Sequence, residues 1–422
     1  MRKFLPYLAL VALSLAAIEL LSWSYLKMTG RATVGTRNEY RYVPHLGYFP
    51  APFQEVKGFA TDRHGFISNG YDVDRDLTRK DSGEYRVFVI GSSLVAGTCV
   101  GDIEKHIASR LEKQLRSEFQ RQQIPLTPHV INAGVSGYFS IQGVALFQHV
   151  IRNLQPDLAI FFDGVNEIQN AVDRMSLRGN DIRALMRSNY DQYSGAALQD
   201  FDDMFSLAGL GGQLFKWSTG YLSTAWLFES ERKRFKNKID KETARLVNAV
   251  EGRGWTVDVS DYTGLSRDID EQLKPTVERY ERNVRDALSL NEFDPQIAIL
   301  YILQPTLVEA SAKSEREREL LRELMVPWQN SPHTIAATRA RFLQLAEEAL
   351  GRIQRQTEGT DAANRRALSF RATFDNKGAD NTYFCDNVHY SFEGYSAILR
   401  AFEEQTFPWI FNHARSKASG RS

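Results

Sequence analysis

Three residue types that acyl transfer requires occur at two distant places in the chain. Asp386 and His389 lie three positions apart near the C-terminal end, and a serine follows the apolar run Arg86–Ile90 in Gly91-Ser92-Ser93-Leu94. A serine hydroxyl becomes an effective nucleophile when a histidine takes its proton and a carboxylate orients the imidazole. Each piece alone is ordinary, because a serine at a strand end is most often a turn residue and Asp-x-x-His is most often a loop with a solvated histidine. Together they indicate acyl-transfer chemistry.

Two further segments follow the same pattern, a short strand that ends in a turn. Val130–Gly137 is a β-rich run that ends in glycines, and Asp157–Glu167 is a second run that closes on Asn166. The chain order is therefore strand then Ser, strand then Gly, strand then Asn, and finally Asp-x-x-His. As an ordered set, these blocks resemble the SGNH (GDSL-type) hydrolase family, whose name lists its Ser, Gly, Asn and His. The resemblance covers about residues 83–170 and 275–412.

The resemblance implies a role for each matching position. Ser93 would be the nucleophile, His389 the general base and Asp386 the acid that orients the imidazole. The backbone N–H groups of Ser93 and Gly137 and the side-chain amide of Asn166 would form the oxyanion hole, where one donor typically lowers the barrier by ~2.7–4 kcal/mol. Taken singly, Asn166 also fits a turn asparagine, and Gly137 a glycine needed only for backbone geometry.

Two positions depart from the pattern of this family. The first block usually reads Gly-Asp-Ser-Leu, but Ser92 stands in place of the Asp, and the third block usually ends in Asn-Asp, but Glu167 follows Asn166. Neither change removes a catalytic group. They leave room for altered loop geometry.

Strand-like and helix-like segments alternate along most of the chain. The expected strands are 86–90, 130–132, 158–162, 296–303 and 368–374, and the expected helices are 103–119, 141–154, 277–290, 315–325, 335–357 and one from about residue 392. Ser391 is placed to cap the last helix, and the polar tail after Ala414 is expected to fray. This alternation predicts an α/β fold, a flavodoxin-like three-layer α/β/α sandwich with a mainly parallel five-stranded sheet. Ligand sites in such sheets lie at the carboxyl ends of the strands, where Ser93, Gly137 and Asn166 are expected.

The 422 residues exceed one minimal domain, so we expect a core with additions. The predicted SGNH core is discontinuous, 83–170 and 267–415, with a connector at 27–82 and a helical insertion at 171–266. Within the insertion, the aromatic stretch Leu210–Phe228 precedes the basic run 232–236. This part is either a helical cap packed on the core or a lid that touches an anionic lipid surface.

The N-terminal residues predict a location outside the cytoplasm. Arg2 and Lys3 precede an apolar run from Phe4 to about Tyr25, which is near the ~20 residues that span a bilayer as a helix. Basic residues before such a run favour an N-terminus inside the cell, with the rest of the chain periplasmic or extracellular. A cleaved signal peptide is the alternative, because Ser14-Leu15-Ala16 has small residues at suitable spacing. The apolar character continues past that point, so an uncleaved anchor, residues 1–26, is expected.

The two cysteines, Cys99 and Cys385, lie close in sequence to Ser93 and Asp386. If the predicted fold forms, both lie at the same rim of the sheet, where an oxidising compartment would permit a disulfide. Two separate buried thiols are the alternative. No metal or cofactor is expected, since two isolated cysteines and eight scattered histidines lack ligand spacing. The charges balance at 52 basic and 52 acidic residues, so nothing points to a nucleic-acid partner.

These observations predict a serine esterase that removes acyl groups, with O-acetyl groups favoured, from an extracytoplasmic glycan or lipid through an acyl-serine intermediate. The same residues would serve an O-acyltransferase that modifies a surface polysaccharide, because the two reactions differ only in what attacks the acyl-serine. The remaining alternative is a catalytically silent SGNH-fold protein with a binding or assembly role. Ser92 in place of Asp is its only support.

Overall fold

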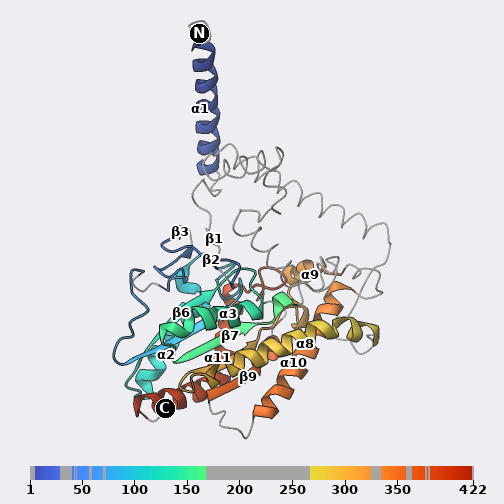
Figure 1. Ribbon diagram of the computed structural model, residues 1–422. Coiled ribbons are helices and arrows are strands. Elements are labelled where there is room, and N and C mark those ends of the chain that lie inside the picture. The colour runs from blue at the N-terminus through green and yellow to red at the C-terminus, as the bar shows by residue number, and fades with distance from the viewer. Residues whose placement is uncertain are drawn as a thin grey trace. The chain divides into compact units, whose positions relative to one another are not determined.

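Five apolar segments pair into one sheet in the computed structural model of this chain (Figure 1). They are β5 Glu84–Gly91, β6 Thr127–Gly134, β7 Leu158–Asp163, β8 Ala298–Leu303 and β9 Arg365–Ser369. Every residue of β5, β7 and β8 is buried, which explains why these strands are mostly apolar on both faces. The strands are parallel throughout, in the order β6-β5-β7-β8-β9. Numbered within the sheet this order is 2-1-3-4-5, that of the flavodoxin-like doubly wound sheets. The predicted α/β fold with a five-stranded parallel sheet is confirmed.

Helices cover both faces of the sheet (Figure 1). On one face α2 Ile107–Arg121 packs against α11 Phe392–Ala418, with the rings of Phe119 and Phe411 5.9 Å apart. On the other face lie α3 Ser140–His149, α8 Arg267–Ser289 and α10 Ile335–Thr357. Neighbouring residues of β7 face opposite layers, because Phe161 lies against Phe147 of α3 and Phe162 against Phe402 of α11. The short helix α9 Glu315–Arg322 follows β8.

The structure describes residues 5–28, 40–41, 43, 45–56, 59–69, 73–167, 267–322, 324–325, 334–357, 364–375, 378 and 381–420. They belong to two units, α1 Leu5–Met28 in one and the residues from Tyr40 onward in the other. Each is described by itself. The predicted insertion at 171–266, with its aromatic stretch and basic run, lies outside the described residues.

The N-terminal helix α1 forms where the apolar run predicts a helix. Across the residues described, no helix is both long enough and apolar enough to span a membrane, and the expected transmembrane anchor is not supported.

Part of the expected connector packs directly on the sheet. It contains two short antiparallel pairs, β1 Tyr40–Arg41 with β2 Phe49–Pro50 and β3 Glu55–Val56 with β4 Phe59–Ala60. Ile67 N–H donates to Asn132 C=O of β6 at 3.1 Å, and Tyr48 Oη donates to Ser136 C=O at 2.6 Å. This segment therefore supports the turn after β6.

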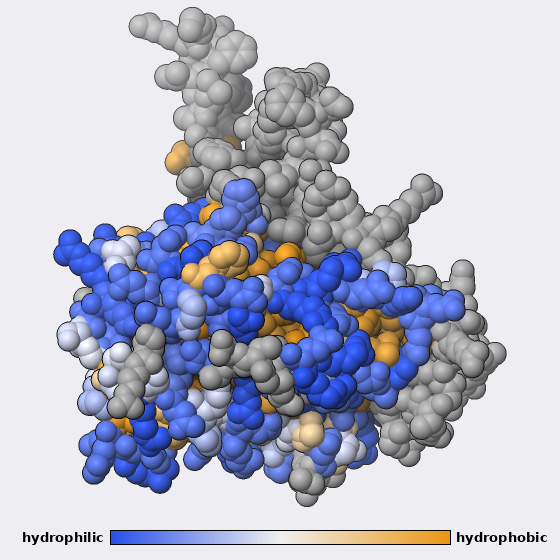
Figure 2. Space-filling view, turned by 60° about the horizontal axis from the view of Figure 1, so that its bottom comes forward, coloured by the Kyte–Doolittle hydropathy of each residue, from blue (hydrophilic) through white to orange (hydrophobic). Residues whose placement is uncertain are grey.

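Figure 2 shows a largely hydrophilic face with hydrophobic residues in small patches.

Several boundaries of the predicted elements are wrong, among them the start of the helix expected at 277–290, which is α8 and begins at Arg267. The expected strand 368–374 is β9 at 365–369, and Ser369 Oγ accepts from Arg371 N–H at 3.3 Å as the chain turns away from the sheet. The tail after Ala414, expected to fray, is helical to Ala418, and Lys417 near the end of α11 pairs with buried Asp157 at 3.4 Å. The predicted cap is confirmed, since Ser391 Oγ accepts from Gly394 N–H at 3.2 Å.

Candidate active site

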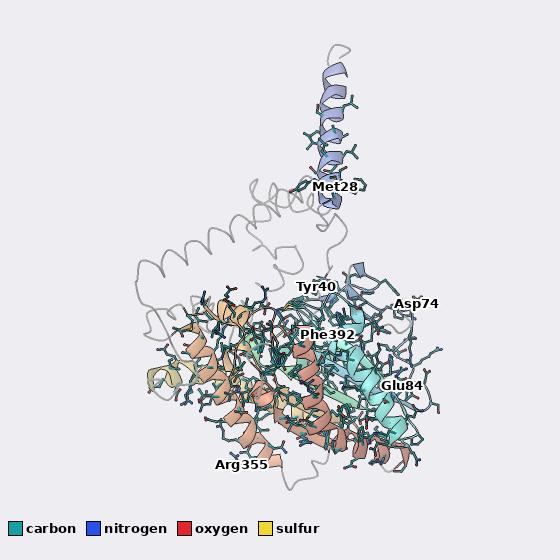
Figure 3. All side chains as sticks on the ribbon, turned by 180° about the vertical axis from the view of Figure 1, so that it is seen from behind. Met28, Tyr40, Asp74, Glu84, Arg355 and Phe392 are labelled. Atoms are coloured by element: carbon teal, nitrogen blue, oxygen red, sulfur yellow. A yellow bond between two sulfur atoms is a disulfide. The ribbon has the colours of Figure 1, made fainter. Side chains whose placement is uncertain are left out.

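The strand order brings the predicted site loops together at the carboxyl ends of neighbouring strands. Gly91, the last residue of β5, is aligned with Gly134 of β6 and with Phe162 of β7. After β5 the chain adds β6 on one side of β5 and then β7 on the other side. The carboxyl ends of β5 and β7 therefore form the topological switch point, where doubly wound sheets bind ligands. Figure 3 shows Phe392, at the start of α11, toward the same end of the α/β unit as Tyr40. Arg355, in the last turn of α10, lies toward the opposite end.

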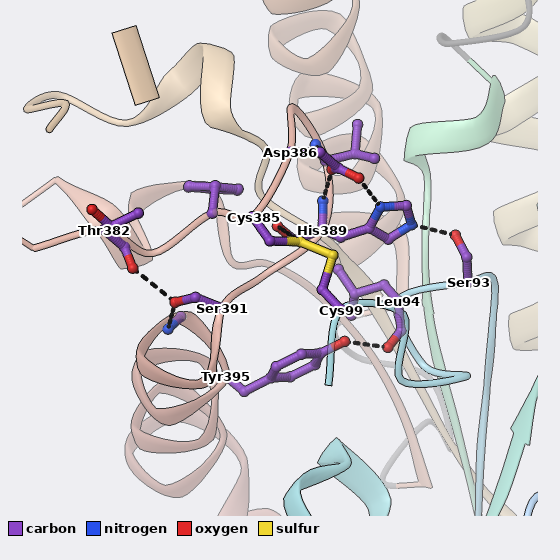
Figure 4. Close-up of a disulfide and its surroundings, with 12 residues drawn as sticks. Ser93, Leu94, Cys99, Thr382, Cys385, Asp386, His389, Ser391 and Tyr395 are labelled. Atoms are coloured by element: carbon purple, nitrogen blue, oxygen red, sulfur yellow. Dashed lines mark hydrogen bonds and ion pairs between the residues drawn. A yellow bond between two sulfur atoms is a disulfide. The ribbon is translucent and has the colours of Figure 1, made fainter. Parts of the chain in front are cut away.

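Ser93 lies two residues after β5, in a short turn. Thr98 N–H donates to Ser93 C=O at 3.0 Å and closes this turn. From the other side, the buried hydroxyl of Tyr395 in α11 donates to Leu94 C=O at 2.6 Å (Figure 4). The residue after Ser93 is thus tied to the helix that follows the histidine.

A continuous hydrogen-bonded relay joins Ser93, His389 and Asp386 (Figure 4). Ser93 Oγ lies 2.7 Å from His389 Nε2, and His389 Nδ1 lies 2.6 Å from Asp386 Oδ2. The other carboxylate oxygen, Oδ1, accepts from the N–H groups of Val388 at 2.9 Å and His389 at 2.7 Å. One short loop therefore presents both the base and its acid.

The electrostatics of Asp386 set the tautomer of His389. Burial alone would raise the pKa of Asp386, but the hydrogen bond and charge of His389 and the backbone N–H groups outweigh burial and lower that pKa. The carboxylate is ionised at neutral pH and can only accept, so Nδ1 of His389 carries the proton. Nε2 is left to accept the proton of Ser93.

A disulfide joins Cys99 to Cys385 across 286 positions of sequence, with a Cα–Cα distance of 6.4 Å (Figure 4). It links the segment that follows Ser93 to the residue that precedes Asp386. Cys385 N–H also donates to His389 C=O at 3.0 Å, which closes the loop around Asp386. Of the two alternatives for the cysteines, the structure has the disulfide.

Gly137 lies in the turn after β6, and Asn166 lies in the helical segment 165–167 that follows β7, at the same carboxyl end of the sheet as Ser93. Asn166 is buried, and its Nδ2 donates to Tyr138 C=O at 2.7 Å, so the segments after β6 and β7 are in contact. Gly137 has φ +79°, a conformation that favours glycine. Their part in an oxyanion hole stays a prediction.

Among the described residues, one group of three potential metal ligands lies within 4.8 Å, Cys99, Asp386 and His389. The sulfur of Cys99 is bonded to Cys385, and both nitrogens of His389 face Ser93 and Asp386. These groups form the relay and the disulfide.

A buried pair of acids, Asp163 and Glu167, lies beside Asn166 and was not predicted from the sequence. Glu167 accepts from Ser140 N–H, at the start of α3, at 2.6 Å, and Asp163 accepts from Gly164 N–H at 2.9 Å. Burial raises the pKa of both acids. The signal was the departure of Glu167 from the Asn-Asp block. The longer side chain reaches a helix N-terminus, where a carboxyl group accepts otherwise unsatisfied N–H groups.

No family model matches the chain, and no curated protein sequence does. Among solved structures, the chain is similar to an alpha/beta hydrolase from the metagenome of Lake Arreo, Spain, with 10% identity and a TM-score of 0.38 over 82% of this chain and 99% of that one. An acetyl xylan esterase from Geobacillus stearothermophilus matches with 13% identity and a TM-score of 0.36, over 77% and 95% of the two chains. A two-domain esterase active on acetylated mannans matches with 12% identity and a TM-score of 0.36, over 81% and 52%. At such values, function has to be inferred from the site itself.

Proposed function

We propose that this protein is an SGNH-type serine esterase that hydrolyses acyl esters, O-acetyl esters above all, on an extracytoplasmic glycan or lipid. The observation that carries the proposal is the relay of Ser93, His389 and Asp386. Its two heavy-atom distances of 2.7 and 2.6 Å lie within the range for a nucleophile, its base and an orienting acid.

In the first step, Ser93 Oγ attacks the ester carbonyl carbon while His389 Nε2 takes the hydroxyl proton. The carbonyl oxygen becomes an oxyanion, held by the N–H groups of Ser93 and Gly137 and by Asn166. The side-chain amide of Asn166 carries N–H donors of the kind this role needs, and its Nδ2 donates to Tyr138 C=O at 2.7 Å. His389 then gives its proton to the leaving alcohol, and the acyl group remains on Ser93.

In the second step, His389 takes a proton from water as the water attacks the acyl-serine, and it returns this proton to Ser93 Oγ as the bond between the acyl carbon and Oγ breaks. The products are the carboxylic acid and free Ser93. If the hydroxyl of a second glycan attacks instead, the same residues transfer the acyl group, and the protein is an O-acyltransferase. This second candidate follows from the chemistry of the common intermediate.

The proposed location rests on the disulfide and the N-terminal charges. Disulfides persist mainly in oxidising compartments, and Cys99 and Cys385 are bonded. Arg2 and Lys3 before the apolar run favour export of the chain that follows. Glycans and lipids carry acyl esters outside the cytoplasm, and they are therefore the substrate class that we propose. Fractionation of cells expressing the full chain tests this part, since recovery in the cytosol would contradict it.

The esterase proposal is tested with the full chain purified in mild detergent, p-nitrophenyl acetate as substrate and a fluorophosphonate probe. We expect turnover and labelling that Ser93→Ala abolishes. Ser92→Ala is the matched control, because it removes the adjacent serine hydroxyl and leaves the relay intact. Equal signals from wild type and Ser93→Ala would instead support a silent binding protein. Adding an acetylated donor glycan with an acceptor glycan, and measuring free acetate against acetylated acceptor, separates hydrolysis from transfer.

A further inference from the structure

Glu317 of α9 is a fully buried carboxylate. A buried charge is costly unless hydrogen bonds satisfy it, so its partners indicate its role. Oε1 accepts from the N–H groups of Tyr383 at 2.7 Å and Phe384 at 3.1 Å. Oε2 accepts from the N–H of Ser314 at 2.9 Å and from its hydroxyl at 3.1 Å. The two oxygens thus bind two different segments.

The contact with Ser314 is a capping box. Glu317 N–H donates to Ser314 Oγ at 3.3 Å while the carboxylate accepts from Ser314 N–H, which is the reciprocal arrangement of the Ser-x-x-Glu motif. This motif needs only one carboxylate oxygen. Starting α9 therefore does not account for the two hydrogen bonds that Oε1 accepts.

Those two bonds hold the base of the loop that carries Asp386 and His389, which we name the catalytic loop, residues 382–390. Phe384 pairs with Tyr390 in an isolated antiparallel bridge, and Cys385 N–H bonds to His389 C=O just above it. The positions of Asp386 and His389 therefore depend on where the bridge lies.

Further contacts attach the same loop to the chain that follows β8. Tyr390 Oη donates to Pro305 C=O at 2.7 Å, and Thr382 Oγ1 donates to Ser314 Oγ at 2.9 Å. Glu317 is the charged member of this set, and hydrogen bonds to an ionised acceptor are about twice as strong as neutral ones.

We propose that Glu317 is a positioning residue for the Asp386–His389 pair, which rests on the proposed function. Its carboxylate fixes the N–H groups of Tyr383 and Phe384. In this way it fixes the position of the His389 imidazole relative to the Ser93 hydroxyl. The relay tolerates little displacement, because a shift of about 1 Å in a catalytic group can cost about 100-fold in rate. A purely structural role would lower stability without lowering turnover.

The variant Glu317→Gln separates these roles, because it keeps the size of the side chain and leaves one carbonyl oxygen where there were two acceptors. Glu112→Gln is the matched control, since Glu112 of α2 accepts from Val130 N–H of β6 at 2.7 Å, away from the catalytic loop. With p-nitrophenyl acetate we expect kcat of Glu317→Gln to fall by about 10- to 100-fold with little change in KM. The control should stay within about twofold of wild type. An unchanged kcat for Glu317→Gln with a lowered Tm would overturn the proposal.

A double variant tests whether Glu317 acts through Asp386. Residues that act as a unit are non-additive, so Glu317→Gln should cost little further kcat in an Asp386→Asn background. Additive losses in kcat would overturn the positioning role.

Hydrogen exchange gives a readout that does not depend on turnover. In wild type, the amides of Tyr383 and Phe384 should be protected, and in Glu317→Gln the segment 382–390 should exchange faster, while Glu112→Gln leaves it unchanged. Unprotected amides in wild type would overturn the proposal even if the variant did not fold. If wild type is not labelled by the probe at Ser93 but its Tyr383 and Phe384 amides are protected from exchange, the proposed function alone is contradicted.

Discussion

At the residue scale, Asp386 divides its two oxygens between function and local structure. Oδ2 bonds to the imidazole of His389, and Oδ1 accepts from two backbone N–H groups of the same loop. The three-residue spacing makes this possible, because one turn of chain brings the imidazole back over the carboxylate. The contacts between this acid and this base therefore lie within one loop and do not involve Ser93.

Asp386→Asn tests this division. The amide is close in size and can keep one oxygen toward the backbone, so the fold should persist. Its NH2 group would then face Nδ1 and force the tautomer whose Nε2 carries a proton. We expect kcat for p-nitrophenyl acetate to fall by roughly 100- to 10,000-fold, as for a triad acid. Asp270→Asn, which alters an ion pair with Arg341 between α8 and α10, serves as control, and similar kcat values for the two variants would contradict the role of Asp386.

At the element scale, the site depends on how closely α11 approaches the catalytic loop. A Cβ added to Gly394, in the first turn of α11, would overlap Tyr383 C=O and lie 2.9 Å from Tyr390 Cβ. Glycine is therefore needed here for close packing. The disulfide between Cys99 and Cys385 adds a covalent link between the same loop and the segment after β5.

Gly394→Ala should push α11 away from the catalytic loop. We expect the free energy of unfolding to fall by about 1–3 kcal/mol, as for overpacking, with a fall in kcat. Gly351→Ala in α10 is the matched control, because its nearest neighbour is the flexible end of Arg355 at 3.5 Å. A gain of about 0.5–1 kcal/mol is expected there, since alanine is the better helix former. Urea unfolding measures both, and equal effects of the two variants would contradict the packing explanation.

Removing the disulfide with the double variant Cys99→Ser, Cys385→Ser should lower the free energy of unfolding by about 2–5 kcal/mol. Turnover should fall too, because the two site segments lose their covalent link. A dithiol reductant should reproduce both effects in wild type and change nothing in the double variant. Wild type that keeps full activity and stability after complete reduction, checked by mass spectrometry, would show that the link is dispensable.

At the scale of the whole molecule, the two ends of the sheet have different roles. The carboxyl ends carry the site, and the amino ends carry a buried polar contact between the sheet and the last helix. There His413 of α11 has Nδ1 2.8 Å from Tyr85 Oη of β5. Burial, with the charge of Lys417, lowers the pKa of His413 from 6.5 to about 4. The fold therefore disfavours the protonated form.

This pKa predicts acid sensitivity of the fold. A histidine whose pKa is lowered by folding stabilises the protein above pH 6.5, and that stability is lost as the pH falls toward 4. The loss amounts to about 3 kcal/mol at most, at 1.36 kcal/mol per pKa unit. Urea unfolding of wild type and His413→Gln from pH 7 to 4 measures it. The advantage of wild type should shrink as the pH falls, whereas parallel curves would rule out His413 as the cause.

Much of the fold follows from local patterns. The strands β5, β7 and β8 read as apolar runs because both faces of each are buried, and Ser391 read as a cap because its hydroxyl bonds within one turn. Edge strand β9 was misplaced, since its sequence reflects one neighbouring strand and partial exposure. Glu317 carried a readable Ser-x-x-Glu signal for a helix start, but nothing local revealed its bonds to Tyr383 and Phe384.

The sequence by itself determined the strand–helix alternation, the edge of the sheet where Ser93 lies and the loop that pairs Asp386 with His389. These depend on neighbours a few positions apart, which periodicity and spacing record. Only the tertiary structure decided that Ser93 meets His389 across 296 positions, that Cys99 bonds to Cys385 and that Glu317 supports the catalytic loop. Such contacts are set by how whole layers pack, and no short stretch of chain encodes them.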